Sequence, residues 1–450
     1  MSPDTSVTVT GRGRTAASAT RLIRPRTYEE VATAVRDRGA RGGIARGLGR
    51  ARGDAAGNAG GAVLDMTGLD RIHAIDVEGG TVLCDAGISL RRLTEVLLPL
   101  GWFPPVDPGA GHVTVGGALG VDAHGGDHHV SGSFSRHVPA FELLTADGRV
   151  RSVRPGTPLF DATAGGMGLT GVILTATLRL RPVETAWMTV DTERAADLDD
   201  LLARLTAPER TRDYSVARID PLARGAATGR AVITRGDHAP QDALPGRERR
   251  RPLRSVARGA RLAASVPGVP EGPLGRAGVA LSPALRYHCA RRAGRHRLRR
   301  LPVFFTPPDR KVPGGGGRGG LVRYRCVVGH GREDALRRIV RRVSEYRCPS
   351  FLATLRRFGE ADSGWLSFPA PGWTLSLDAP ASLPGLAGLL DALDDEVAEA
   401  GGRVDLAEDS RLRPESLARM YPRLDDFRAL RAELDPRGVF VSDLSRRLAL

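Results

Sequence analysis

Residues 113–134, VTVGGALGVDAHGGDHHVSGSF, form a stretch rich in glycine and small hydroxyl side chains. Glycine lets the backbone pass close to a flat ligand or adopt a positive φ, and Thr114, Ser131 and Ser133 add hydroxyl donors. Neither G-x-G-x-x-G before a helix nor G-x-x-x-x-G-K-[ST], the patterns of common nucleotide sites, is present. We therefore predict that this stretch forms the floor of a cofactor site of another type.

Two further glycine clusters flank this stretch in the sequence. Residues 42–58 lie between a predicted helix and a predicted strand at 62–66, and residues 165–171 precede a predicted buried strand at 172–180. In the first cluster, backbone N–H groups with Arg46 and Arg50 suit a pyrophosphate, although an ordinary turn-rich linker has a similar composition. Together, the three clusters can wrap one extended ligand.

Between the clusters, local patterns predict short helices and strands. Ser89 caps a helix that runs through residue 100. Residues 141–153 predict a hairpin closed by a type I′ turn at Asp147 and Gly148. Residues 384–400 predict an amphipathic helix.

The composition limits the classes of protein to which the chain can belong. A chain of 450 residues with 41% hydrophobic content can build two domains. Its net charge is +15, but Lys311 is the sole lysine, so we interpret the charge as an arginine-rich composition and predict no nucleic-acid partner. The four cysteines are scattered, which favours neither a disulfide framework nor a metal site. With no signal peptide or long apolar run, we expect a cytoplasmic protein with at most peripheral membrane association.

Several motifs carry a resemblance to a known family. The sequences RGLGR at 46–50, TVGG at 114–117 and GGMGLTG at 165–171 resemble the PCMH-type FAD-binding domain of the vanillyl-alcohol oxidase superfamily. Later motifs extend the resemblance to the decaprenylphosphoryl-β-D-ribose 2-oxidase family of actinobacteria; they are SFPAPGW at 367–373, DSR at 409–411 and MYPR at 420–423.

The resemblance implies an α+β fold with two lobes. It implies an FAD-binding domain at 1–184, a substrate domain at 185–402 with an antiparallel sheet flanked by helices, and a C-terminal segment at 403–450 that returns to the FAD domain. Residues at about 240–320 are dense in Arg, Pro and Gly, and we expect mobile loops over the substrate entrance there.

The resemblance also implies FAD as cofactor. Related flavoproteins often bond the flavin to a histidine in the first glycine loop; here Arg50 stands at that place, so we predict non-covalent binding. The residues expected to bind the cofactor are Ala45, Arg46, Gly47, Leu48, Gly49, Arg50, Gly53, Asp54, Gly109, Thr114, Val115, Gly116, Gly117, Asp122, His124, Gly125, Gly132, Ser133 and Ile173.

The implied reaction is oxidation of a secondary alcohol of a sugar or polyprenyl-phospho-sugar to its keto form. Hydride would pass to flavin N5 while a protein base takes the hydroxyl proton. The family works with a separate short-chain reductase, and we expect one here if epimerisation is the purpose. Two alternatives remain: a degenerate FAD-binding relative with a non-catalytic partner role, and an oxidase of a different polyol or secondary-metabolite sugar.

The substrate side departs from the family pattern. The family's active-site lysine is replaced by Glu408, a nearby tyrosine by Asp405 and a glutamine by Arg325. We predict that Glu408 and Arg325 face each other and that both act in catalysis with His124, because a carboxylate in a closed pocket needs a counter-charge. The expected substrate-binding residues are Arg323, Arg325, Trp373, Thr374 and Ser376.

Overall fold

The structure is a computed structural model. It describes residues 6–15, 17–109, 111–208, 212–254, 283–290, 293–305, 320–350 and 352–450. Much of the segment predicted to form mobile loops, at 255–282 and 306–319, lies outside these residues. None of the helices within the described ranges is long and apolar enough to cross a membrane.

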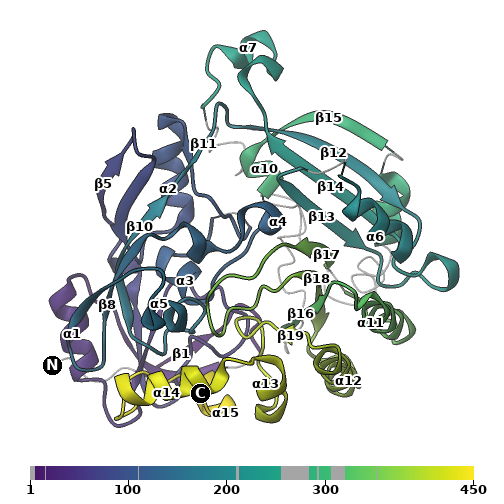
Figure 1. The fold of residues 1–450 in the computed structure, drawn as a ribbon. Coiled ribbons are helices and arrows are strands. Elements are labelled where there is room, and N and C mark those ends of the chain that lie inside the picture. Colours follow the sequence, from purple (N-terminus) through teal and green to yellow (C-terminus); the bar gives the residue numbers. More distant parts are fainter. Residues whose placement is uncertain are drawn as a thin grey trace.

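The N-terminal lobe is built on two larger sheets (Figure 1), and β7 (Trp102–Phe103) pairs separately with β11 (Arg181–Pro182). One has the order β1-β2-β4-β3, with β2, β4 and β3 parallel; the strands are β1 (Ser6–Thr10), β2 (Ala17–Ile23), β3 (Gly43–Arg46) and β4 (Ala62–Asp65). Helix α1 (Tyr28–Arg36) starts at Thr27, whose side chain accepts from the N–H of Glu30. Val31 and Val35 of this helix are buried in the same core as Leu64 of β4.

The second sheet is antiparallel and has the order β5-β6-β10-β8-β9. Its strands are β5 (Ile72–Asp76), β6 (Thr81–Asp85), β8 (Ala140–Leu144), β9 (Val150–Val153) and the central, mostly buried β10 (Val172–Arg179). The helices of this lobe are α2 (Leu90–Leu97, capped by Ser89), α3 (Val115–Gly120), α4 (His128–Ser131) and α5 (Pro158–Thr163).

The predicted hairpin forms between β8 and β9, but its turn is not of type I′. A type I′ turn needs positive φ at both central residues, and of Asp147 and Gly148 only the glycine has it, at 80°. The N–H of Gly148 donates to the carbonyl of Thr145 at 2.9 Å. The connection is thus longer than two residues, which lets Asp147 keep an ordinary negative φ.

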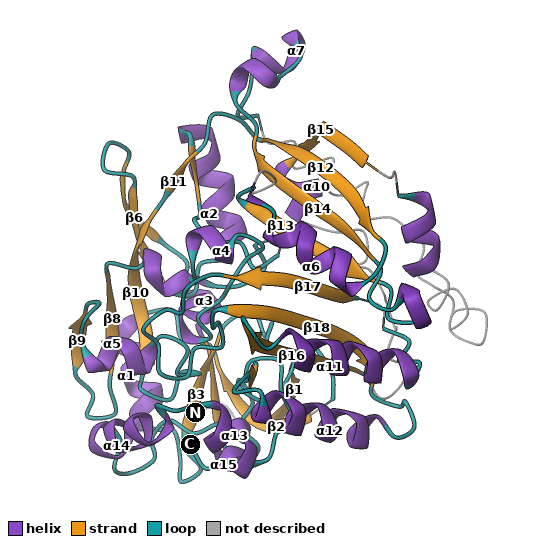
Figure 2. Cartoon of the chain, turned by 45° about the vertical axis from the view of Figure 1, so that its right-hand side comes forward, coloured by secondary structure: helices purple, strands orange, loops and turns teal. Residues whose placement is uncertain are grey.

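The rest of the chain is built on an eight-stranded antiparallel sheet of the order β15-β12-β14-β13-β17-β18-β16-β19. The strands are β12 (Trp187–Ala195), β13 (Tyr214–Ile219), β14 (Ala231–His238), β15 (Ala293–Arg300), β16 (Leu321–Gly329), β17 (Ala353–Phe358), β18 (Gly372–Pro380) and β19 (Arg403–Val404). Figure 2 shows one face covered by α6 (Leu198–Thr206), α11 (Glu333–Glu345) and α12 (Leu386–Glu399).

Alternation along β16 decides which side chains reach the other face. Tyr324 and Cys326 are buried in the core with Leu336 of α11 and Leu393 of α12. Since successive side chains on a strand point to opposite faces, Arg323 and Arg325 lie on the face turned away from these helices. The predicted α+β fold with an antiparallel sheet flanked by helices is confirmed.

The C-terminal residues lie against the first sheet (Figure 1). After β19 the chain forms α13 (Pro414–Met420), α14 (Leu424–Leu434) and α15 (Asp443–Leu448). Gly43 of β3 donates to Val439 at 2.8 Å, and Arg447 forms a bidentate ion pair with Asp54, both distances 2.9 Å. The division into domains at residues 184 and 402 stays a prediction.

Candidate active site

A cavity of about 740 Å³ lies between the glycine clusters and the uncovered face of the eight-stranded sheet. All three clusters contribute to its wall. Among the residues expected to bind the cofactor, those that line it are Ala45, Arg46, Gly47, Leu48, Gly49, Arg50, Gly109, Thr114, Gly116, Gly117, His124 and Ile173.

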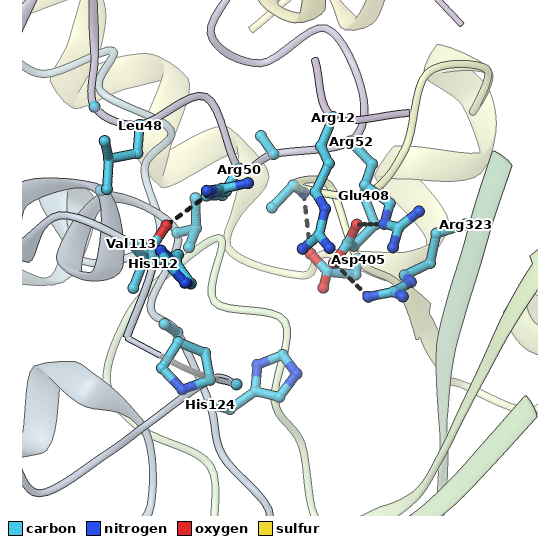
Figure 3. A pocket seen from close by; sticks show the side chains of 18 of the residues that line it. Arg12, Leu48, Arg50, Arg52, His112, Val113, His124, Arg323, Asp405 and Glu408 are labelled. Atoms are coloured by element: carbon cyan, nitrogen blue, oxygen red, sulfur yellow. Dashed lines mark hydrogen bonds and ion pairs between the residues drawn. The ribbon is translucent and has the colours of Figure 1, made fainter. Parts of the chain in front are cut away.

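The first glycine loop presents backbone donors to this cavity. The N–H groups of Leu48, Gly49 and Arg50 donate to no acceptor within the described part of the chain. Arg50 is held by donation from Nε to the carbonyl of His112 at 2.9 Å (Figure 3). A run of unpaired backbone N–H groups beside a cation is an arrangement that binds phosphate.

The second cluster meets the first at Thr114. Its side chain caps α3 by accepting from the N–H of Gly117 at 3.1 Å. A Cβ on Gly47 would lie 2.1 Å from Thr114 Oγ1, so a glycine is required at position 47 for the two loops to touch. The unpaired amides, the close loops and the cavity of about 740 Å³ fit a dinucleotide such as FAD, which these two loops and Ile173 would hold.

The structure places other expected cofactor residues away from the cavity. Gly53 and Asp54 join the C-terminal segment: a Cβ on Gly53 would lie 1.5 Å from the carbonyl oxygen of Asp409, and Asp54 pairs with Arg447. Val115 is a fully buried core side chain. These residues therefore pack chain segments together and do not line the cavity. A glycine-rich composition serves such close packing as well as ligand binding.

Residues at the end of the central stretch also have structural contacts. Asp122 is buried and accepts from the N–H of Ser135 at 3.0 Å. Ser133 donates its N–H to Asp362 at 2.7 Å. Gly125 packs against the side chain of its neighbour Asp127, and Gly132 ends α4 with a φ of 72°. None of the four expected cofactor residues of this group lines the cavity.

His124 lies where the glycine loops meet the eight-stranded sheet. Arg325 Nη1 is 3.2 Å from His124 Nε2. A guanidinium only donates, so Nε2 accepts and the proton of a neutral ring is on Nδ1. Burial and, after it, the charge of Arg325 lower the pKa of His124 well below its usual value. His124 is therefore neutral at physiological pH.

Opposite the glycine loops, three arginines and three carboxylates form a connected network. Figure 3 shows Arg12, Arg52, Arg323, Asp405 and Glu408 gathered on one side of the cavity. The ion pairs join Arg325 to Asp405 at 2.9 Å and to Glu408 at 3.1 Å, Arg323 to Asp378 at 2.5 Å and to Glu408 at 3.6 Å, and Arg52 to Asp378 at 3.3 Å and to Glu408 at 3.5 Å.

The predicted contact between Glu408 and Arg325 is therefore present. Burial would raise the pKa of Glu408, but Arg325, Arg323 and Arg52 together bring it below its ordinary value. Burial raises the pKa of Asp405, against the opposing charge of Arg325. The arginines thus lower the pKa of Glu408, whereas burial raises that of Asp405, and both carboxylates contact the guanidinium of Arg325.

Strand alternation separates the expected substrate residues. Arg323 and Arg325 line the cavity. Ser376 is the cross-strand partner of Arg325 and shares its face, and Thr374 lies two residues along the same face. Trp373 is on the opposite face, where its Nε1 donates to Glu333 of α11 at 3.0 Å. The prediction that Trp373 contacts substrate is wrong for this structure, because its ring is buried beneath a helix.

The sequence reasoning missed many side chains of the cavity wall. Four charged ones matter most for the argument here, and only one of these four had a detectable signal. Asp378 continues the alternation of Thr374 and Ser376, so the period of the strand could have identified it. The others, Arg12, Arg52 and Arg356, are three among many arginines and carry no local mark.

Comparison with known proteins identifies the family and the cofactor. An FAD binding domain family matches residues 19–154, and a D-arabinono-1,4-lactone oxidase family matches residues 357–448. The chain is 55% identical over 372 residues to an uncharacterised protein of Streptomyces coelicolor, covering 81% of this chain and all of that protein. It is 26% identical over 95% of its length to an L-gulono-1,4-lactone dehydrogenase of Mycobacterium tuberculosis, covering 95% of that enzyme.

A further relative extends over the whole chain. Decaprenylphosphoryl-β-D-ribose oxidase of Mycolicibacterium smegmatis is 39% identical over 460 aligned residues, which cover all of this chain and 98% of that enzyme. An FAD-binding domain, a lactone oxidase domain and full-length oxidase relatives establish the cofactor as FAD and the protein as an oxidoreductase. The chain therefore belongs to the family of FAD-dependent sugar and lactone oxidoreductases that includes decaprenylphosphoryl-β-D-ribose oxidase.

Proposed function

We propose that the protein oxidises a secondary hydroxyl of a sugar or polyprenyl-phospho-sugar to a ketone. The observation that carries the proposal is the contact of His124 with Arg325, at the point where the glycine loops meet the charged network. Bound FAD would supply the hydride acceptor. The full-length relative that acts on decaprenylphosphoryl-ribose supports a sugar of this class.

In this proposal the chain has three tasks. His124 and Arg325 orient the sugar hydroxyl by hydrogen bonds. The Asp405–Glu408 pair accepts the hydroxyl proton, and Asp405, with its raised pKa, takes the larger share, since two coupled carboxylates titrate as one unit. Arg323 and Arg52 keep Glu408 ionised and fix its position.

Anaerobic reduction of the bound flavin tests the proposal. The purified protein would be mixed with farnesylphosphoryl-ribose, ribitol or gulono-1,4-lactone, and loss of the visible flavin absorbance followed with time. We expect bleaching by at least one sugar and a keto product by NMR. If none of them bleaches a flavin that dithionite reduces readily, the proposal fails, and an oxidase of a different polyol or a non-catalytic FAD-binding relative would take its place.

A separate nicotinamide-dependent reductase completes the proposal where net epimerisation is the purpose. The enzyme alone should then stop at the keto sugar. Formation of the epimer by the isolated protein, with no second enzyme added, would contradict this part of the proposal.

A further inference from the structure

Arg356 places a guanidinium without a counter-ion in the cavity wall. It lies on β17 between Thr354 and Phe358, and it lines the cavity with Thr354. Arg325 and Arg323, on the same sheet face, are both paired with carboxylates. Arg356 forms no ion pair with any residue that the structure describes, and its Nε is buried without a hydrogen-bond acceptor.

The surroundings of Arg356 are positive. Burial lowers the pKa of its guanidinium to about 10, and Arg325 and Arg323 act in the same direction. The carboxylate of Asp127 acts weakly against them but is beyond ion-pair distance. Arg356 is still cationic at neutral pH, and a partly buried cation among cations is unfavourable unless an anion joins it.

Arg356 also lies beside His124. The imidazole of His124 packs edge-on against Phe358, with ring centroids 5.0 Å apart. Phe358 is two residues from Arg356 on the same face of β17. Arg356 is also among the charges that lower the pKa of His124, after burial, Arg325 and His128. An anion on Arg356 would therefore be close to any group that His124 contacts.

We infer that Arg356 binds an anionic group of the substrate, a phosphate or a carboxylate carried close to the hydroxyl that is oxidised. This inference rests on the proposed function, which places that hydroxyl at His124, and it narrows the substrate to acidic sugars. A guanidinium suits either anion because its N–H groups match two oxygens at once. Thr354, on the same face, adds a hydroxyl to the site.

Matched pairs of sugars test the inference on the FAD-loaded enzyme. Ribose 1-phosphate would be compared with methyl riboside, and ribonate with ribitol. Binding would be measured anaerobically from the shift of the flavin absorbance, and the limiting rate of flavin reduction by rapid mixing. Tighter binding of ribose 1-phosphate than of methyl riboside would indicate a phosphate site. Tighter binding of ribonate than of ribitol would indicate a carboxylate site.

The variants are Arg356→Gln, Arg356→Lys and the control Arg357→Gln. Arg357 is exposed and points to the opposite face of the same strand. In Arg356→Gln we expect Kd for the preferred anionic sugar to rise on the order of 10²-fold, while Kd for its neutral partner changes less than about twofold. Arg356→Lys should restore a large part of the affinity, and Arg357→Gln should behave as the wild type.

Two results would overturn the inference: equal binding of charged and neutral sugars by the wild type, or equal weakening of both by Arg356→Gln. The second result would mark Arg356 as structural. If anionic sugars bind through Arg356 but no sugar reduces the flavin, the inference holds and the proposed function fails. If neutral sugars alone reduce the flavin, the proposed function holds and the inference about Arg356 fails.

Discussion

Replacement of Glu408 by Gln removes the carboxylate that three arginines share. Its oxygens lie 3.1–3.6 Å from Arg325, Arg323 and Arg52. At an effective dielectric constant of about 20, each contact is worth about 5 kcal/mol before desolvation is counted. Each arginine keeps a second carboxylate, Asp405 or Asp378, so we expect a net loss of about 2–3 kcal/mol, less than the roughly 3–5 typical of a fully unpaired buried charge.

The kinetic effect of Glu408→Gln follows from the pKa values of the pair. Arg325 and its neighbours outweigh burial and lower the pKa of Glu408, which makes it a weak base. We expect the limiting rate of flavin reduction to fall less than about tenfold and the substrate Kd to rise, because Arg325 is less well held. Asp405→Asn should slow reduction on the order of 10²-fold, the usual effect of removing a positioned base.

The pH profile provides a second readout. The negative charge of Glu408 contributes to the raised pKa of Asp405, after burial. The rate of flavin reduction should rise with pH as Asp405 loses its proton, and in Glu408→Gln this limb should move to lower pH. The linked stability change has the opposite sign: a raised native pKa stabilises the fold at low pH, and that contribution is lost as pH rises through it.

These expectations are tested by stopped-flow reduction of the flavin and by thermal unfolding of the Glu408→Gln variant. The control variant is Glu415→Gln, which changes an exposed glutamate. The reasoning is refuted if Glu408→Gln matches this control in unfolding midpoint, substrate Kd and pH profile. A fall of about 10²-fold in the limiting rate with an unchanged Kd would instead make Glu408 itself the base.

Three further predictions concern the cofactor and the frame of the site. Acid precipitation should release all flavin into the supernatant, since no histidine stands in the first glycine loop; colour in the pellet would contradict this. Gly53→Ala should cost at least about 3 kcal/mol in unfolding measurements, because its Cβ would overlap the carbonyl of Asp409, whereas Gly388→Ala, with open space around it, should be neutral or stabilising. Arg447→Gln should lower the free energy of unfolding by about 2–4 kcal/mol, because it removes the ion pairs that hold the C-terminal helix to Asp54 and Asp409. Thermal unfolding should show a lower midpoint.

Local sequence determined the elements that build the flavin side of the cavity. Ser89 caps its helix, β10 is a buried strand, and the two strands of the predicted hairpin pair, although its turn is not of the predicted type I′. Caps and strand periods are predictable because they depend on neighbours a few residues apart. The cavity is lined by Gly47, Gly49, Gly116 and Gly117, because residues without a side chain leave the backbone accessible wherever the chain places them.

Tertiary structure alone decided which charges meet. Arg325 and Asp405 are 80 residues apart in the sequence and become partners because β16 pairs with β19. Asp54 joins Arg447 across 393 residues and so faces the C-terminal helix, where the sequence suggested the cofactor. The same holds for Arg356: nothing in the local sequence marks it among the other arginines. Only the fold brings it into the cavity wall without an ion pair to any described residue, since ion pairing depends on distance in space.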